Sequence, residues 1–373
     1  MDRTRPGVTA RESGPAGLAA CRPKASPPIL LIAAALLCTG TLARADNIFI
    51  TFDSNNDTVE EYASGSITAG TSAYTGATFV NGSGSDLRGA DGEAFDTNGN
   101  LYVTNADNDT ITEYAATSGS LVRVITAPAL NQARALAFDA SGNLFIANTN
   151  GGNILEITAG SLASASPAAT TYASGVGHPW GLAFDGSGNL YVSDNNDSII
   201  YQIQPGGSPT TYISTPGQNN TINKPTGIAF DSAGNLFIAN AANNQVEEFT
   251  GTTADGVAYS ADLNNPDGIA FDSSGDLFVV NFDHDSPEGD SYGVSTIQEF
   301  APLPDGGQLL SEFNDDTNDV NDGINLKDGG FIAIETNAGV PLLGAVPEPS
   351  NTGLMMLGAG CVAGFTFLRR RRT

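Results

Sequence analysis

The chain has few basic residues, and most of them lie near its two ends. Lys and Arg account for 15 of the 373 residues, against 41 Asp and Glu, and the net charge is −26. Ten of the bases precede residue 46 or fall in the last five positions, which leaves 38 acids and five bases between residues 46 and 346. Because a segment with a net charge of about −33 repels phosphate backbones, we expect no nucleic-acid partner.

Cysteine is scarce as well. The three cysteines are Cys21, Cys38 and Cys361, so none lies between residues 46 and 346. That middle region therefore offers no disulfide, no thiolate metal site and no cysteine nucleophile. A domain of this size can bury enough apolar surface without a disulfide, so the composition is compatible with secretion.

The long stretches rich in Ala, Leu, Glu and Lys that are typical of helical proteins are missing too. Only 15% of the residues are charged, whereas glycine alone contributes 44 residues. Short apolar runs alternate with Asn, Asp, Gly and Ser, the residues of tight turns. This pattern predicts an all-β fold.

Residues 1–45 have the features of a signal peptide. A basic, Pro-rich stretch is followed by an apolar run at residues 29–38. Ala43 and Ala45 then form the two small residues of a small-x-small cleavage site. Ten apolar residues are too few to span about 30 Å of hydrocarbon, which needs ~20, so a retained membrane anchor is the weaker alternative. We expect export through the secretion translocon and a mature chain that starts at Asp46.

The last 28 residues carry three features in a fixed order. A linker at residues 341–352 contains a Val-Pro-Glu-Pro motif, residues 353–368 have no charge, and four arginines follow. An apolar stretch with arginines behind it is expected to stop in the bilayer with the arginines on the cytoplasmic side. The residues concerned are Val346, Pro347, Glu348 and Pro349, then Arg369, Arg370, Arg371 and Arg372.

This tail resembles the PEP-CTERM sorting signal. The resemblance implies a transmembrane helix within residues 353–373 that anchors the chain transiently in the inner membrane. It also implies an exosortase-type processing enzyme as partner, and delivery to the cell envelope or exterior. The alternative is a permanent single-span tail.

One sequence block recurs five times between the two ends. Each copy has the form of GLAFDGSGNLYVSD, which starts at Gly181. The aspartates that mark the copies are 41 to 46 residues apart, a spacing typical of propeller blades. They are Asp96, Asp139, Asp185, Asp231 and Asp272.

The chemistry of the block predicts a hairpin. The Asp can accept a hydrogen bond from the N–H two residues on, and the Gly can adopt positive φ, so a short turn joins the first two strands. The Ala and Phe before the Asp are expected to pack between blades. A third and a weaker fourth strand follow each copy, and Asn or Asp ends the second strand at positions 105, 148, 194, 240 and 281.

The blocks resemble NHL repeats, which implies a β-propeller of four-stranded antiparallel blades over residues 46–340. Two partial copies flank the five full ones: residues 48–62 match a second and third strand, and residues 323–336 match a first strand with its hairpin. Six blades are therefore expected, with the closing blade shared between N- and C-terminal strands, because closure removes both exposed edges. Residues 48–51 and 331–334 are both candidates for the second strand of that blade.

A ligand site is expected at the mouth of the central channel, just before the first position of each repeat. The acids in this column could hold Ca²⁺ through oxygen ligands, and a solvated polar rim is the alternative. Glu93 stands where the other copies have Leu or Ile, either as a ligand or base or because the first blade is irregular. The candidate residues are Asp91, Glu93, Trp180, Asp267 and Asp322; Arg134 and Thr226 occupy the same column.

Two functions remain open at this level. The first is a non-catalytic binding or matrix protein that presents loops to polysaccharide or protein, in the envelope setting that the PEP-CTERM resemblance implies. The second is a metal-dependent enzyme, since His178 before Trp180 is similar to the setting in streptogramin lyase and gluconolactonase-like propellers. His284 lies in an acidic insertion, and the Asp194 to Asp197 segment is explained by Asx-turn capping without a metal.

Overall fold

The computed structural model describes the parts of the chain that form the sheets. These are residues 47–52, 57–63, 77–81, 86–116, 118–214, 222–251, 253–260, 263–281, 296–302, 309–314 and 329–335. All of them belong to the compact unit Ala43–Thr373. The predicted signal peptide with Ala43 and Ala45, the sorting motif, the predicted transmembrane segment, Asp322 and His284 lie outside the described residues.

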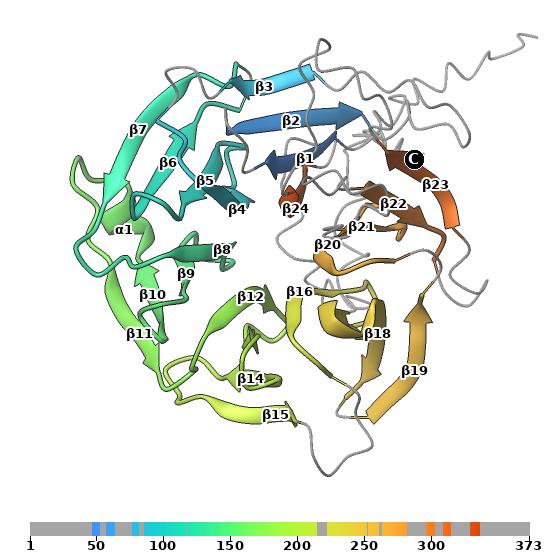
Figure 1. The fold of residues 1–373 in the computed structure, drawn as a ribbon. Helices are drawn as coiled ribbons and strands as arrows, with labels where there is room; N and C mark the ends of the chain where they lie inside the picture. Colours follow the sequence, from blue (N-terminus) through green and yellow to red (C-terminus); the bar gives the residue numbers. More distant parts are fainter. Residues whose placement is uncertain are drawn as a thin grey trace, which may run out of the picture. The chain divides into compact units, whose positions relative to one another are not determined.

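Each of the five full repeats forms one four-stranded antiparallel sheet, as the sequence predicts. In every one the strands are hydrogen-bonded in chain order (Figure 1). The strands are β4 (Ala90–Phe95), β5 (Leu101–Asn105), β6 (Thr110–Tyr114) and β7 (Leu121–Thr126); β8 (Ala133–Phe138), β9 (Leu144–Asn148), β10 (Asn153–Ile157) and β11 (Thr170–Ser174); β12 (Pro179–Phe184), β13 (Leu190–Asp194), β14 (Ile199–Ile203) and β15 (Thr210–Ser214); β16 (Pro225–Phe230), β17 (Leu236–Asn240), β18 (Gln245–Thr250) and β19 (Thr253–Tyr259); and β20 (Pro266–Phe271), β21 (Leu277–Asn281), β22 (Thr296–Phe300) and β23 (Leu309–Asn314). Two short helical turns, α1 (Ala159–Leu162) and η2 (Ala241–Asn243), lie in the connections.

The sixth sheet in the described residues joins the two ends of the repeat region. Its order is β24 (Gly329–Glu335), β1 (Asn47–Phe52), β2 (Thr58–Ala63) and β3 (Ala77–Asn81). This order answers the question that the repeat pattern leaves open, because β1 is the second strand and β24 is the first. The first strand therefore begins at Gly329, six residues later than the expected start at Gly323.

The hairpin between the first and second strands has the geometry that the repeat predicts. In the third sheet, Asp185 Oδ1 accepts the N–H of Ser187 at 2.9 Å and that of Asn189 at 2.8 Å. Gly188 has φ +81°, in the left-handed region that favours glycine. The other four repeats have the same two bonds to their Asp, at positions 96, 139, 231 and 272.

Aromatic side chains pack the sheets against one another. An aromatic residue on the second strand of one sheet meets the Phe at the end of the first strand of the next, with ring centroids 4.9 to 5.2 Å apart and the rings edge to face. Such pairs add about 0.5–1.5 kcal/mol to the free energy gained from apolar burial. The pairs are Phe49–Phe95, Tyr102–Phe138, Phe145–Phe184, Tyr191–Phe230 and Phe237–Phe271.

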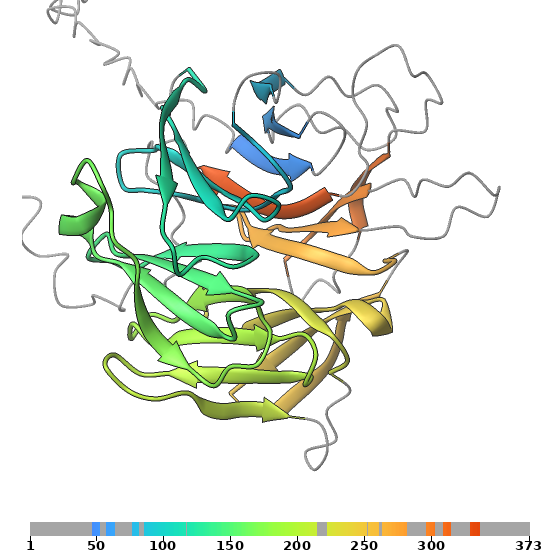
Figure 2. The ribbon, with the colours of Figure 1, turned by 60° about the vertical axis from the view of Figure 1, so that its left-hand side comes forward.

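The first strands contact one another in sequence. β4 lies against β8, β8 against β12, β12 against β16, β16 against β20, β20 against β24, and β24 against β4. Figures 1 and 2 show these strands on the inner side of the sheets, with β7, β11, β15 and β19 outermost. Side chains near the start of each first strand therefore converge on one region. Within the described ranges, no helix is both long enough and apolar enough to cross a membrane.

Candidate functional site

The candidate site is formed by the second residue of each first strand. Val103 pairs with Glu93 in the first sheet, and Ile50 pairs with Ile332 in the sixth. The residue in register with Asp91 in the sixth sheet is therefore Gly330. Asp322 lies outside the described residues, so the described part of this column holds two acids, Asp91 and Asp267.

Hydroxyl groups hold these strand starts in place. Thr104 Oγ1 on β5 donates to the carbonyl of Arg134 at 2.8 Å, and Ser193 Oγ on β13 donates to the carbonyl of Thr226 at 2.6 Å. Thr51 on β1 makes the same contact with the carbonyl of Asp91. In three junctions, a hydroxyl of one sheet thus fixes the backbone of the site residue in the next.

Glycine allows the close approach that these bonds need. A Cβ on Gly92 would lie 2.3 Å from the Arg134 carbonyl oxygen, and one on Gly227 would lie 2.4 Å from the Asp267 carbonyl oxygen. Real Cβ atoms do not come so close to backbone. The repeat's glycine therefore determines how near the site residues of adjacent sheets can be.

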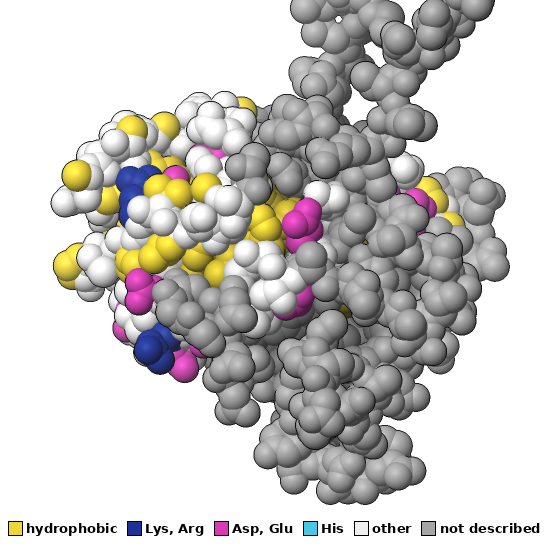
Figure 3. All heavy atoms as spheres, turned by 90° about the horizontal axis from the view of Figure 1, so that it is seen from above, with side chains coloured by type: hydrophobic (Ala, Val, Ile, Leu, Met, Phe, Trp, Pro, Cys, Tyr) yellow, Lys and Arg dark blue, Asp and Glu magenta, His cyan; other side chains and the backbone are white. Residues whose placement is uncertain are grey.

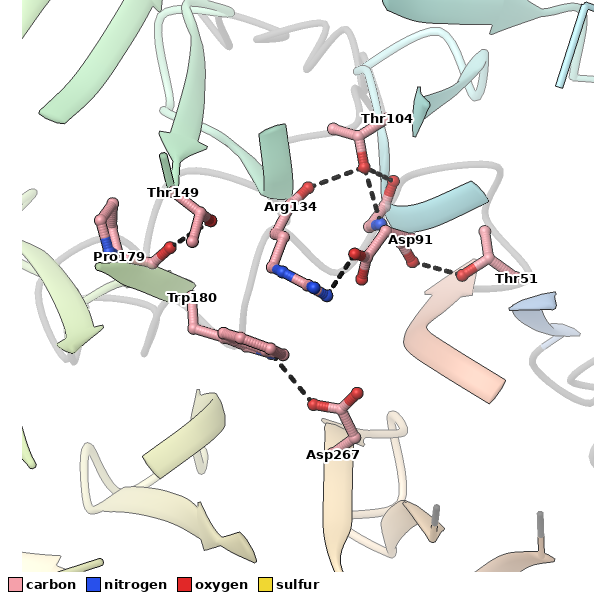
Figure 4. A network of polar contacts seen from close by, with 9 residues as sticks. Thr51, Asp91, Thr104, Arg134, Thr149, Pro179, Trp180 and Asp267 are labelled. Atoms are coloured by element: carbon pink, nitrogen blue, oxygen red, sulfur yellow. Dashed lines mark hydrogen bonds and ion pairs between the residues drawn. The ribbon is translucent and has the colours of Figure 1, made fainter. Parts of the chain in front are cut away.

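Four side chains form a continuous polar network across the site (Figure 4). Arg134 Nη1 on β8 pairs with Asp91 Oδ2 on β4, and the Arg134 guanidinium lies over the Trp180 ring at 3.7 Å from its centroid. Trp180 Nε1 on β12 donates to Asp267 Oδ1 on β20 at 3.1 Å. Three of the predicted site residues, Asp91, Trp180 and Asp267, are thus brought together by Arg134.

Arg134 is the residue of this network to which the sequence analysis assigned no role. It is the one base in a column whose other described members are Asp91, Trp180, Thr226, Asp267 and Gly330, and its charge was the available signal. A guanidinium that both pairs with a carboxylate and stacks on an aromatic face connects groups that are remote in sequence. The described ranges contain only three other bases, Arg88, Arg123 and Lys224.

Burial raises the pKa of both carboxyl groups in the network. Burial raises the pKa of Asp267 to about 7, and the Asp91 carboxylate adds to this rise, whereas Arg134 and the Trp180 N–H oppose it. Burial also raises the pKa of Asp91, and the charge of Arg134 lowers it. One carboxyl group in the network therefore changes its charge near neutral pH.

We expect this ionisation to be visible in tryptophan fluorescence, because Trp180 is the only tryptophan of the chain. Its emission should change with a midpoint near pH 7, where Asp267 ionises, and the change should be absent in Asp267→Asn. An emission that is constant from about pH 5 to pH 9, or an identical transition in the variant, would contradict the assignment.

The raised pKa of Asp267 predicts how the free energy of unfolding changes with pH. The unfolded chain loses the Asp267 proton near pH 4, whereas the folded chain keeps it up to about pH 7. Because the folded state binds more protons in this window, its stability should decrease as the pH rises from about 4 to 7.

Glu93 is on β4, two residues after Asp91, and is 6% exposed. Its strand is not irregular: the bulge between Ala90 and Glu93 recurs between Ala133 and Leu136 on β8. The explanation of Glu93 by an irregular first sheet is therefore not supported. His178 is exposed, and no three His, Cys, Asp or Glu side chains in the described ranges meet as a metal site.

Comparisons with known proteins agree on the fold. The structure is similar to a solved nidogen–laminin complex (15% identity, TM-score 0.58, 78% of this chain and 98% of that chain) and to a streptogramin B lyase (16% identity, TM-score 0.50, 68% and 82%). A protein of unknown function from Bacteroides caccae is similar as well (14% identity, TM-score 0.55, 78% and 99%). No family model and no curated protein matches the sequence. The sheets and these likenesses together show a β-propeller fold.

Proposed function

We propose that this chain is an exported, non-catalytic binding protein whose six blades close into a ring. The closing blade takes β24 from the C-terminal side and β1, β2 and β3 from the N-terminal side. Contacts between all successive first strands, including β24 with β4, support the closure. The signal-peptide-like leader and the PEP-CTERM-like tail support a protein that acts in the cell envelope or outside the cell.

The observation that carries the binding function is the Asp91–Arg134–Trp180–Asp267 network. Arg and Trp are the residue types most enriched where binding energy concentrates, and here they stack. The two carboxylates offer hydrogen-bond acceptors beside the indole. An uncharged or mildly acidic polysaccharide is the ligand class that we favour, since hydroxyl groups can use both acceptors and donors.

The shortage of basic residues argues against a strongly anionic ligand. On the face seen in Figure 3, which is turned by 90° from the view of Figure 1, the described side chains are mostly uncharged, with few basic and acidic groups among them. A ligand that relies on many phosphate or sulfate contacts would need a basic patch.

Fluorescence titration tests the binding function. Dextran, as a neutral probe, and alginate, as an acidic one, are added while Trp180 emission is recorded. A saturable change is expected for one of them, and Arg134→Gln should weaken it at least tenfold. Arg88→Gln is the matched control, because Arg88 is exposed. No response to either probe, or equal responses in both variants, would count against the proposal.

An enzymatic function is the second candidate. Asp267 can exchange a proton near neutral pH, as a general acid or base must. The likeness to a streptogramin B lyase concerns the fold alone. An enzyme would be indicated if Asp267→Asn abolished turnover of a substrate while leaving its binding intact.

Processing of the tail is tested separately. We expect secreted protein to lack the residues after the Val-Pro-Glu-Pro motif, and Glu348→Ala to block their removal. Intact mass spectrometry decides this, because secreted protein that retains residues 351–373 would contradict processing. Failure here would leave the binding function standing.

A further inference from the structure

Asp194 is the one acid in a column of asparagines. It ends β13, whereas Asn105, Asn148, Asn240 and Asn281 end the second strands of the other full-repeat sheets. Each of these asparagines has a partner for both side-chain atoms. Asn148, for example, accepts the Asn131 N–H at 2.7 Å and donates to Asn153 Oδ1 at 2.7 Å.

In three of these sheets the asparagine side-chain amide donates a hydrogen bond to an acceptor that the third sheet lacks. Asn105 donates to Thr110, Asn148 to Asn153 and Asn281 to Thr296, each the first residue of the third strand. In the third sheet this residue is Ile199, which has no polar side-chain atom. The exchange of Asn for Asp thus accompanies the loss of the acceptor.

The second carboxylate oxygen of Asp194 is buried and has no hydrogen-bond partner. The residue is 0% exposed. Its Oδ1 accepts the N–H of Asp197 at 3.1 Å, which is the predicted Asx-turn cap, whereas Oδ2 has no hydrogen-bond partner among the described residues. A buried anionic oxygen without a partner is costly, so capping explains only half of this carboxylate.

A second carboxylate lies near Asp194 Oδ2. A Cβ placed on Gly177 would lie 2.2 Å from Asp194 Oδ2 and 3.3 Å from Asp197 Oδ2. Both oxygens therefore lie close to the same point beside Gly177, which has φ +57° and leaves this approach open because it has no side chain. Asp197 is exposed, so its carboxylate is in contact with solvent.

We propose that Asp194 and Asp197 bind a Ca²⁺ ion above Gly177. Calcium accepts carboxylate, carbonyl and water oxygens in flexible geometry, whereas Mg²⁺ demands a near-ideal octahedron at shorter distances. The ion gives Oδ2 its partner and offsets the repulsion between the two carboxylates. This site is separate from the channel-mouth network and does not depend on the proposed binding function.

Burial has a consistent electrostatic effect. It raises the pKa of the Asp194 carboxyl, the Asp197 charge adds to the rise, and backbone N–H groups of Asp197, His178 and Asn196 lower it. A bound cation would oppose this rise, because it favours the ionised carboxylate. The site is tested by a substitution that the chain itself suggests.

Asp194→Asn gives the third sheet the residue that four other sheets have, so the variant is expected to fold. Calorimetric titration of the full, EDTA-treated protein with CaCl₂ should give a dissociation constant of about 10⁻⁴–10⁻³ M, typical of open extracellular sites. Both Asp194→Asn and Asp197→Asn should weaken binding at least tenfold. Asp107→Asn, an exposed acid in the corresponding turn of the first sheet, should leave it unchanged.

Three results would overturn the site. They are no calcium binding by the unsubstituted protein up to ~10 mM, unchanged binding by Asp194→Asn, or loss of binding in Asp267→Asn instead. The first would mean that Asp194 and Asp197 hold no ion, and the last would place the ion at the network of Asp91, Arg134, Trp180 and Asp267. Titration with MgCl₂ should give weaker binding than calcium.

Discussion

Replacing Phe145 by alanine is expected to lower the free energy of unfolding by about 3–5 kcal/mol. Phe145 is 3% exposed on β9 and packs edge to face on Phe184 of the next sheet at 5.0 Å and on Tyr172 of its own sheet at 4.8 Å. The substitution removes both ring contacts and leaves a cavity between two sheets. Urea denaturation followed by circular dichroism measures the loss.

Two controls show whether packing between sheets is the cause. Phe145→Leu keeps most of the apolar volume and should cost clearly less. Val122→Ala on β7, where the side chain is 53% exposed, should change stability by no more than about 0.5 kcal/mol. Equal losses for Phe145→Ala and Val122→Ala would mean that the aromatic contacts do not hold the sheets together.

A charged residue introduced into the sixth sheet should lower the free energy of unfolding at least as much. Ile334 is 4% exposed on β24 and belongs to an apolar cluster with Ile48, Ile50 and Phe278. Ile334→Asp buries a carboxylate without a partner in the sheet that joins the two ends of the repeat region. We expect a loss of about 4 kcal/mol or more, which a domain of ordinary stability does not tolerate as a folded monomer.

Ile334→Val is the matched control, because it removes one methylene group at the same position without adding a charge. It should cost about 0.5–1.5 kcal/mol and leave cooperative unfolding intact. If Ile334→Asp unfolded at the same urea concentration as the unsubstituted protein, β24 would not be buried in this junction.

Local chemistry made most of the fold predictable. The Asp-x-x-Gly hairpins depend on contacts within four residues, so Asp185 and Gly188 behave as their sequence implies. The Phe of each block packs against an aromatic residue of the preceding sheet, and the same pair recurs at five junctions. Repetition thus allowed five sheets to be placed without any long-range information.

The sixth sheet was harder because its copies are incomplete. The pattern matched residues 323–336 to a first strand with its hairpin, yet the first strand, β24, begins at Gly329. Phe331 to Ile334 have the apolar character of either a first or a second strand, and only pairing with β1 decides between them. The same pairing places Gly330 in the column of Asp91.

The network of Asp91, Arg134, Trp180 and Asp267 depends on distances between side chains that the sequence does not contain. Arg134 and Asp91 are 43 residues apart, and Trp180 and Asp267 are 87 apart. The repeat alignment places them in one column, but which side chains meet depends on rotamers and on the close approach at Gly92. Asp194 is similar: its substitution in an Asn column was visible in the sequence, whereas its unpartnered oxygen was not.

The most direct test of the account is a disulfide across the sixth sheet. Asn47 on β1 and Glu335 on β24 are paired in register, and adjacent strands bring Cα atoms to about 4.5–5.5 Å, within the reach of a disulfide. Residues 46–346 contain no cysteine, so Asn47→Cys with Glu335→Cys introduces the only two thiols of that region. Non-reducing peptide mapping should find these cysteines linked within one chain; free thiols at both positions under oxidising conditions, or links only between chains, would contradict the pairing of β1 with β24 in the sixth sheet.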